Sequence, residues 1–546
     1  MRKKWIVLAV CAALLSGIEA IACTGLLVGK KASIDGSVMI SYAADSHALY
    51  GEMYHWPAAV WPKGAMLDVT EWDTGKPLGQ IAQVEKTYSV IGNMNEHQLA
   101  ITESTFGGRS ELHDPKGIMD YGSLIYITLQ RAKTAREAIS VMTSLVKEYG
   151  YYSSGESFSI ADKNEAWVME MIGKGPNDKG AVWVAIRIPD DCISAHANQS
   201  RIQQIPFDDK ENCIYSPDVV SFAREKGYFK GKDKDFSFQQ AYCPYDFGGL
   251  RGCEARVWSF FRQYDNTMDQ YADFIKGDPT KEPMPLYIKP NRKLSVQDVH
   301  NGMRNHFEGT DLDMTKDAGA GSYKVPYRWR PMTFEVDGQK YTNERAIATQ
   351  QTGFVIVPQM RNWLPDAIGG ILWFGVDDAD MAVFNPVYCS ATRVPECYRV
   401  GNGDMYTFSW TSAFWMHNWV ANMAYHKYSF MIKDIRKVQQ ELENGNKDAI
   451  PAIDKAAQEL YEKNPEEAIK FLTWFSTSNA ESATARWKEL GEYLLIKYID
   501  GNVKKEENGK FKMNPYGKPA YPDFPGYDEE YYRNIVKSAG ERLRIK

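Results

Sequence analysis

The chain has 546 residues, of which 44% are hydrophobic and 25% are charged, and its formal net charge is −6. This composition is typical of a globular protein large enough for an extensive core or for two domains. The small acidic excess provides no basic surface for nucleic acid, and no apolar run after the first residues is long enough to span a membrane.

The first 22 residues have the pattern of a secretory signal peptide. A charged Arg2-Lys3-Lys4 start precedes a short apolar run, and Ala20-Ile21-Ala22 is a small-x-small cleavage site. We therefore expect signal peptidase to remove residues 1–22, so that an exported protein, periplasmic or extracellular, begins at Cys23. A lipoprotein with lipid on Cys23 is the alternative, but Ala20 stands where a lipoprotein box usually has Leu, and no flexible tether follows.

Strands and helices alternate in the first half of the remaining chain. Apolar residues around an Asp35-Gly36 turn predict a hairpin, and a second hairpin-like unit is expected from 88 to 102, before the break at Phe106-Gly107-Gly108. A capping box at Thr134 and Glu137 opens a helix that ends at Gly150. Further strands are expected at 158–161, 166–172 and 182–188. The predicted class is α+β with layered sheets.

The second half has two different patterns. Residues 206–338 are rich in Asp, Gly, Pro and Tyr, and we expect long loops and insertions there. From about residue 425 the chain becomes helical, with a stripe through Ile435 and Val438 and with Asn464 as a cap before Pro465. Residues 500–518 are polar and expected to be exposed. The predicted organisation is a domain over 23–424 with a loop-rich insertion around 206–338, followed by a helical extension over 425–546.

Cysteine use is consistent with an oxidising compartment. One of the eight cysteines, Cys11, lies in the signal peptide, so seven remain. Short spacings favour Cys243–Cys253 and Cys389–Cys397, which leaves Cys192 for Cys213 and Cys23 unpaired; free buried thiols are the alternative for each pair.

An N-terminal cysteine carries a thiol and an α-amine on one residue. The amine titrates at about 8, so near neutral pH part of it can accept the thiol proton, directly or through a water molecule. Removal of residues 1–22 would therefore complete a nucleophile at Cys23 and keep the precursor inactive.

Several motifs between Cys23 and about Tyr425 carry a family resemblance. They include Cys23-Thr24-Gly25, Gly92-Asn93-Met94-Asn95-Glu96-His97, His196-Ala197-Asn198, Pro326-Tyr327-Arg328-Trp329 and Trp373-Phe374-Gly375-Val376-Asp377-Asp378. Together they resemble the dipeptidase A family of cysteine peptidases, which belongs with N-terminal-nucleophile hydrolases such as penicillin V acylase and bile salt hydrolase. The resemblance implies a four-layer αββα fold and hydrolysis of dipeptides through an acyl-enzyme, without a cofactor or metal.

The resemblance also assigns roles to single residues. It implies that Cys23 is the nucleophile, that Asp45 holds its ammonium or thiol, and that Asn198 donates to the oxyanion. Thr105 matches the position of a backbone N–H donor to the same oxyanion, and Arg256 resembles a further active-site arginine. Such preorganised donors are worth about 3 kcal/mol each.

Two positions need a separate interpretation. We expect Glu103 to pair with the ammonium of a dipeptide and Arg256 with its carboxylate. The acylases carry an arginine three residues before the aspartate, where this chain has Tyr42. Tyr42, Arg256 or another cation must therefore take the place of that arginine.

Plainer and rival interpretations stay open. Asp45 and Asn198 also suit turns, and Arg256 suits a structural ion pair. An N-acyl amide hydrolase is the nearest alternative enzyme, and His196 permits a Cys–His hydrolase that uses Cys23 or Cys192.

Two further possibilities concern non-enzymatic functions and metals. The 32 tyrosines and 15 tryptophans would suit an envelope-anchored binding protein, provided that Cys23 is lipidated. Acidic groups at 311–317 and 377–380 lack the spacing of a calcium loop, so no metal is expected. Homo-oligomer formation is left open.

Overall fold

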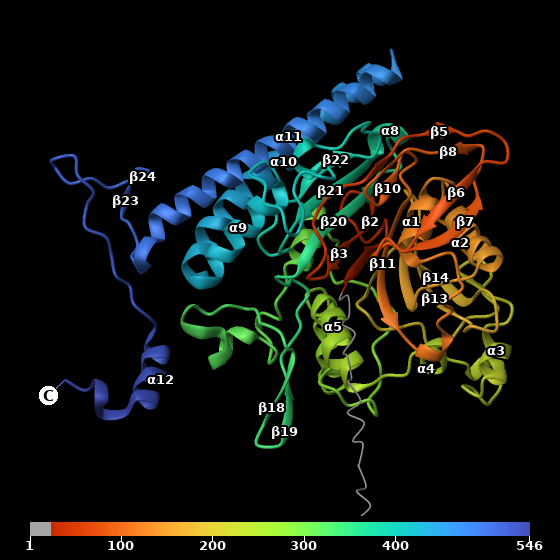
Figure 1. Ribbon diagram of the computed structural model, residues 1–546, viewed down its shortest axis with the longest axis horizontal. Coiled ribbons are helices and arrows are strands. Elements are labelled where there is room, and N and C mark those ends of the chain that lie inside the picture. The colour runs from red at the N-terminus through yellow and green to blue at the C-terminus, as the bar shows by residue number, and fades with distance from the viewer. Residues whose placement is uncertain (1–22, 546) are drawn as a thin grey trace, which may run out of the picture.

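The computed structural model describes residues 23–545, which form two large antiparallel sheets with helices around them (Figure 1). The predicted signal peptide lies outside the described residues. The mixture of helices and strands confirms the α+β class.

The first sheet contains the strand that follows Cys23. In spatial order its strands are β17 (Tyr287–Ile288), β15 (Ile193–His196), β1 (Gly25–Val28), β2 (Val38–Ile40), β20 (Thr352–Met360), β21 (Gly370–Val376) and β22 (Asn385–Tyr388), and β3 (Tyr42–Asp45) also pairs with β20. The hairpin predicted around Asp35-Gly36 is confirmed, because Leu27 pairs with Ile40 across β1 and β2.

The second sheet contains most of the other strands expected from the sequence. In order these are β16 (Cys213–Tyr215), β14 (Ala181–Ile188), β13 (Ala166–Gly173), β12 (Gly155–Ala161), β11 (Ala100–Gly107), β10 (Met94–Asn95), β9 (Val90–Ile91) and β4 (His55–Trp56). The strands expected at 158–161, 166–172 and 182–188 are therefore confirmed as β12, β13 and β14.

The two sheets pack face to face, and each outer face is covered by helices. Leu27 belongs to the core between the sheets, whereas its neighbours Leu26 and Val28 belong to a second core beneath the helices, because successive strand side chains point to opposite faces. Both faces of β1 are therefore buried, which explains its unbroken apolar sequence.

Different helices cover the two outer faces. On the second sheet lie α1 (Tyr121–Leu129) and α2 (Ala135–Tyr149), which share a core with β12 and β13. On the first sheet lie α5 (Ala255–Arg262) and α7 (Val296–Met303). Thr134 is the N-cap of α2, where its side chain accepts from Glu137 N, and Gly150 is the C-cap, so the helix starts and stops where predicted.

Residues 206–338 contain more helix than the expected long loops. Besides α5 and α7 they include α3 (Val219–Glu225), α4 (Phe238–Tyr242) and α6 (Ala272–Ile275), all short and joined by irregular segments. A two-stranded ribbon of β18 (Thr333–Val336) and β19 (Gln339–Thr342) projects into solvent. The weak periodicity of this region reflects helices of eight residues or fewer, which are too short to show a repeating apolar stripe.

The helical pattern after residue 425 is confirmed. Helices α9 (Ala413–His426), α10 (Tyr428–Tyr461) and α11 (Pro465–Tyr498) pack together, and α10 and α11 contact the edge strand β22 (Figure 1). Asn464 caps α11 by accepting from Glu466 N, with Pro465 at the first helical position. No described helix is long and apolar enough to cross a membrane.

The last segment lies apart from the body (Figure 1). It contains the short strands β23 (Glu506–Glu507) and β24 (Lys510–Phe511) and the helix α12 (Glu529–Ala539), which has no buried residue. Residues 500–518 are mostly exposed, as predicted.

The expected disulfides are wrong. All seven described cysteines are free. The thiol of Cys243 donates to the carbonyl of Phe106, and that of Cys389 donates to the carbonyl of Asp366. Cys213 lies on β16 of the second sheet, whereas Cys192 directly precedes β15 of the first. Spacing in the sequence did not reveal these positions, and the alternative of buried free thiols applies.

Candidate active site

Cys23 is fully buried two residues before the start of β1, where residues of both sheets meet. Its Sγ lies 3.6 Å from Tyr42 Oη on β3 and 3.6 Å from Glu103 Oε1 on β11. Burial is the largest cause that raises the pKa of the thiol well above its ordinary value, and the charges of Glu103 and Asp45 act in the same direction. The thiol is therefore protonated at neutral pH and requires a proton acceptor before it can attack.

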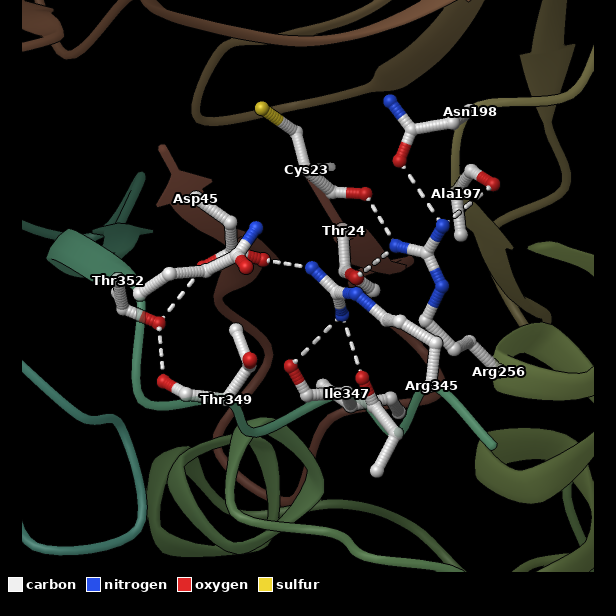
Figure 2. Close-up of polar contacts among 12 residues, drawn as sticks. Cys23, Thr24, Asp45, Ala197, Asn198, Arg256, Arg345, Ile347, Thr349 and Thr352 are labelled. Carbon is white, nitrogen blue, oxygen red and sulfur yellow. Dashed lines mark hydrogen bonds and ion pairs between the residues drawn. The ribbon is translucent and has the colours of Figure 1, made fainter. Parts of the chain in front are cut away.

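Asp45 lies at the end of β3, beside β20. Its Oδ1 accepts from Thr352 Oγ1 at 2.6 Å, and its Oδ2 forms an ion pair with Arg345 (Figure 2). Burial raises the pKa of this carboxyl, and Arg345 and Thr352 oppose the shift. The Asp45 backbone hydrogen-bonds the Cys23 thiol and lowers its pKa. The expected contact of the carboxylate with a Cys23 ammonium stays a prediction.

Arg345 is the site residue that the sequence analysis missed. It lies 300 residues after Asp45, and it also donates to the carbonyl of Ile347 at 3.2 Å (Figure 2). No motif surrounds it, so only the fold could reveal the pair. The place of the missing arginine before Asp45 is taken by two groups: Tyr42 contacts the thiol, and Arg345 neutralises the aspartate.

Arg256 on α5 holds the backbone around Cys23. Its five N–H groups have five acceptors. Four of them are Cys23 O at 2.6 Å, Thr24 Oγ1 at 2.8 Å, Ala197 O at 3.1 Å and Asn198 Oδ1 at 2.9 Å (Figure 2), and the fifth is Gly252 O at 2.8 Å. A guanidinium has five donors, so none is left for a substrate carboxylate. The expectation that Arg256 binds the carboxylate of a dipeptide does not fit this geometry, and the residue instead positions Cys23 and Asn198.

Asn198 and Thr105 lie together, as the resemblance implies for an oxyanion site. Asn198 follows β15 in a left-handed conformation, with φ of 58°. Its Nδ2 donates to Thr105 O at 2.7 Å, while Arg256 fixes its Oδ1. The pairing of β11 with β12 is irregular between Thr105 and Gly107, which interrupts the regular ladder at this point. Arg256 links Asn198 to Cys23, because it donates to Asn198 Oδ1 and to the Cys23 carbonyl (Figure 2).

His196 has a structural role. Its two ring nitrogens bond Ser104 at 2.6 Å and Ser159 at 2.7 Å, and the ring is fully buried. Burial, followed by the charges of Arg201 and Arg256, lowers its pKa to about 3, so the ring is neutral. Because both nitrogens are occupied by serines, the alternative of a Cys–His pair is not supported. The ring also lies 2.9 Å from where a Cβ on Gly25 would stand, so only glycine fits there.

A cavity of about 330 Å³ reaches the two residues that contact Cys23 Sγ, Tyr42 and Glu103. Besides Glu103 its walls contain two more carboxyl groups, those of Glu52 and Asp73. The aromatic residues of its wall are Tyr42, Tyr50, Tyr54, Trp72, Tyr121, Tyr126 and Phe354. None of the described residues that line this cavity is Lys or Arg. The cavity is therefore acidic and aromatic, a lining that favours a cationic group.

Glu103 is the buried acid of this cavity. It is 1% exposed, and Tyr42 Oη donates to its Oε1. Burial raises its pKa to about 7, and the hydrogen bond from Tyr42 opposes the shift. Glu103 thus changes charge close to neutral pH, immediately beside the thiol.

The acidic groups considered for calcium contact protein side chains. Asp380 pairs with Arg436 and accepts from Tyr428 at 2.7 Å, and Asp377 accepts from Asn418 at 2.9 Å. Residues 23–545 contain no group of three or more His, Cys, Asp or Glu side chains that could hold a metal ion.

Comparison with known proteins places the chain in a family. The model of peptidase family C69 matches residues 22–53 and 48–441. A probable dipeptidase of Latilactobacillus sakei is 29% identical over 499 residues, which cover 88% of this chain and 96% of that protein. A probable dipeptidase of Salmonella dublin is 27% identical over 71% of this chain and 84% of its own length. Dipeptidase A of Lactobacillus helveticus is 24% identical over 74% and 82%. The chain belongs to peptidase family C69.

Proposed function

We propose that the protein is an exported cysteine dipeptidase whose nucleophile is Cys23 at the N-terminus of the processed chain. The proposal includes the N-terminal-nucleophile form of the αββα fold. Three observations support it: the Ala20-Ile21-Ala22 motif before Cys23, the contacts of the buried thiol with two residues that line an acidic cavity, and the dipeptidase names of relatives that align over most of the chain.

In the proposed mechanism, the α-amine of Cys23 accepts the thiol proton, and Sγ attacks the carbonyl carbon of the scissile amide. The negative charge on the carbonyl oxygen is stabilised by Asn198 Nδ2 and by the backbone N–H of Thr105. The α-ammonium then returns the proton to the leaving amine, which leaves an acyl-enzyme on Sγ. Water hydrolyses this thioester and regenerates Cys23.

The proposed substrate class rests on the negative charge of the cavity, which no basic residue of its lining neutralises. Glu103, Glu52 and Asp73 line it without any Lys or Arg, so the free ammonium of an unblocked peptide would supply the missing cation. A volume of about 330 Å³ suits a short substrate. The anionic substrates of penicillin V acylase and bile salt hydrolase would meet repulsion here, which makes the acylase the second candidate.

A hydrolysis screen tests the proposal. The processed protein is offered unblocked dipeptides, longer peptides, and N-acylated amino acids at equal concentrations, and release of free amino acid is measured. We expect rapid turnover only of the unblocked dipeptides. Preferred turnover of the N-acylated compounds would replace the proposal with the acylase. If no compound is hydrolysed and Cys23 carries lipid, the envelope-anchored binding protein becomes the better explanation.

A further inference from the structure

Glu103 has a second carboxyl group as its neighbour on the adjoining strand. Across β11 and β12, Thr105 lies opposite Glu156 and Glu103 lies opposite Phe158. Because side chains alternate along a strand, Glu103 and Glu156 are diagonal neighbours on the same face of the sheet. Glu156 is fully buried and Glu103 is 1% exposed, so both acids are shielded from bulk solvent.

The contacts of the two carboxyl groups are complementary. Oε1 of Glu103 accepts from Tyr42 and from the Cys23 thiol, and Oε1 of Glu156 accepts from Thr105 Oγ1. The other oxygen of each group, Oε2, is buried and has no N–H or O–H partner among residues 23–545. Two buried oxygens on neighbouring carboxyl groups are satisfied if one group is protonated and donates to the other.

The surroundings contain acids but no cation that forms an ion pair with either carboxyl group within the described chain. The titratable groups that act on Glu103 or Glu156 from the neighbouring elements are Cys23, Tyr42, Asp73, Tyr121, Tyr126 and Tyr151. Each of these is neutral or negative. The α-amine that cleavage would expose on Cys23 is a further titratable group, on the residue whose thiol contacts Glu103, and near neutral pH it is partly an ammonium. Two adjacent carboxylates in such a site repel one another strongly, so they do not ionise together near neutral pH.

We propose that Glu103 and Glu156 share one proton at neutral pH, with Glu156 as the protonated partner that donates to Glu103. Glu103 then presents a single negative charge to the thiol and the cavity. Glu156 is thereby a positioning residue: it touches neither substrate nor thiol, and it acts by stabilising the ionised form of Glu103. Its effect on hydrolysis rests on the proposed dipeptidase function, whereas the shared proton does not.

The electrostatics of the pair agree with this arrangement. Burial and the charge of Glu103 raise the pKa of Glu156 well above its ordinary value, whereas the pKa of Glu103 rises only to about 7. Glu103 is therefore the group that ionises near neutral pH. Binding of a substrate ammonium should strengthen as the pH rises through about 7 and weaken below it.

Infrared spectroscopy tests the shared proton without any substrate. At pH 8 the difference spectrum between the wild-type protein and Glu156→Gln should contain one protonated-carboxyl band that the variant lacks. Glu225→Gln, on the exposed end of α3, is the control and should lose no such band. If Glu156→Gln also loses none, Glu156 is not protonated and the proposal is overturned.

The pH profile of kcat/KM on an unblocked dipeptide tests the positioning role. The amide of Glu156→Gln still donates to Glu103, so the midpoint of the rise should stay within about half a pH unit of wild type. Glu156→Met removes the donor and should move the midpoint up by about one unit or more, because the ionised form of Glu103 loses a charge-assisted hydrogen bond. Loss of rate in both variants at an unchanged midpoint would indicate a merely structural role and overturn the proposal. If no dipeptide is hydrolysed but the infrared band is lost, the dipeptidase function fails and the shared proton stands.

Discussion

The surroundings of the Cys23 thiol favour its protonated form, which is a poor nucleophile. Its side-chain neighbours are Tyr42 and Glu103, and burial beside these groups raises its pKa. The α-amine released by cleavage before Cys23 would be a base on the same residue. At the scale of single residues, the proposed chemistry therefore depends on Cys23 more than on a partner histidine.

Replacement of the nucleophile gives the first prediction. Cys23→Ala should abolish dipeptide hydrolysis and leave the fold intact, and Cys23→Ser should retain at most weak activity, because a hydroxyl is a poor nucleophile when its base is only an amine. Turnover is measured on the processed proteins, with circular dichroism and thermal unfolding as the check on folding. Normal hydrolysis by the folded alanine variant would make Cys23 structural.

Blocking the substrate amine gives the second prediction. Acetylation of the dipeptide should lower kcat/KM by roughly two orders of magnitude or more, because a charged hydrogen bond in a desolvated site is lost. Glu103→Gln should hydrolyse free and acetylated dipeptides at similar, low rates, whereas the control Glu225→Gln should keep the full preference for the free amine. A preference that survives in Glu103→Gln would remove Glu103 from substrate binding.

At the scale of elements, α5 supports the site through a single arginine. Arg256→Lys should lower kcat about 100-fold with little change in KM, since lysine cannot hold both the Cys23 carbonyl and Asn198 Oδ1 in place. The matched control is Arg262→Lys at the other end of the same helix, where the side chain pairs with Asp269 at the surface. Steady-state kinetics of both variants decide, and equal losses in the two would point to a general effect on α5.

The fourth prediction concerns the ion pair between Asp45 at the end of β3 and Arg345 in the segment before β20. Arg345→Met should destabilise the protein by roughly 3–5 kcal/mol, because Asp45 is left buried without its cation. Adding Asp45→Asn to this variant should restore part of the loss, since the buried carboxylate that lost its ion-pair partner is then removed as well. Urea unfolding at pH 7 measures both. An equally large loss in the double variant would show that packing, rather than charge, dominates at this contact.

The sequence predicted elements best where the pattern was local. The Asp35-Gly36 hairpin, the Thr134 cap and the Asn464-Pro465 start of α11 all depend on neighbouring residues, and all are confirmed. The family motifs pointed to Cys23, Thr105, Asn198 and Arg256, and hydrogen bonds connect these four residues in the structure. Local patterns cannot contain the ion pair of Asp45 with Arg345 or the carboxyl pair of Glu103 with Glu156, because these depend on how distant strands pair. The predicted disulfides were wrong for the same reason, because spacing along the sequence does not show which cysteines the fold brings together.

At the scale of the whole molecule, the site draws on both sheets and on α5. Cys23 and Asp45 belong to the first sheet and the segment before it, and Glu103 and Thr105 belong to the second. Arg256 reaches from α5 to the carbonyl of Cys23. Asp45 and Thr352, which are in contact, are more than 300 positions apart in the sequence. The site therefore forms only when the whole chain has folded. Exposure of the α-amine is then the last step that the proposed enzyme needs, and it is the one that the fold itself does not provide.

The processed N-terminus gives the last prediction. The secreted protein should begin at Cys23 with a free amine, because Ala20-Ile21-Ala22 directly precedes it. Intact-mass measurement and N-terminal sequencing decide this directly. A matched pair separates processing from folding: one form begins at Cys23, and the other carries a single added glycine before Cys23. The added residue turns the α-amine of Cys23 into an amide, which cannot accept a proton, so activity should fall at least 100-fold while thermal unfolding stays the same. Full activity with the added glycine, or a lipid adduct on Cys23, would contradict the proposed mechanism.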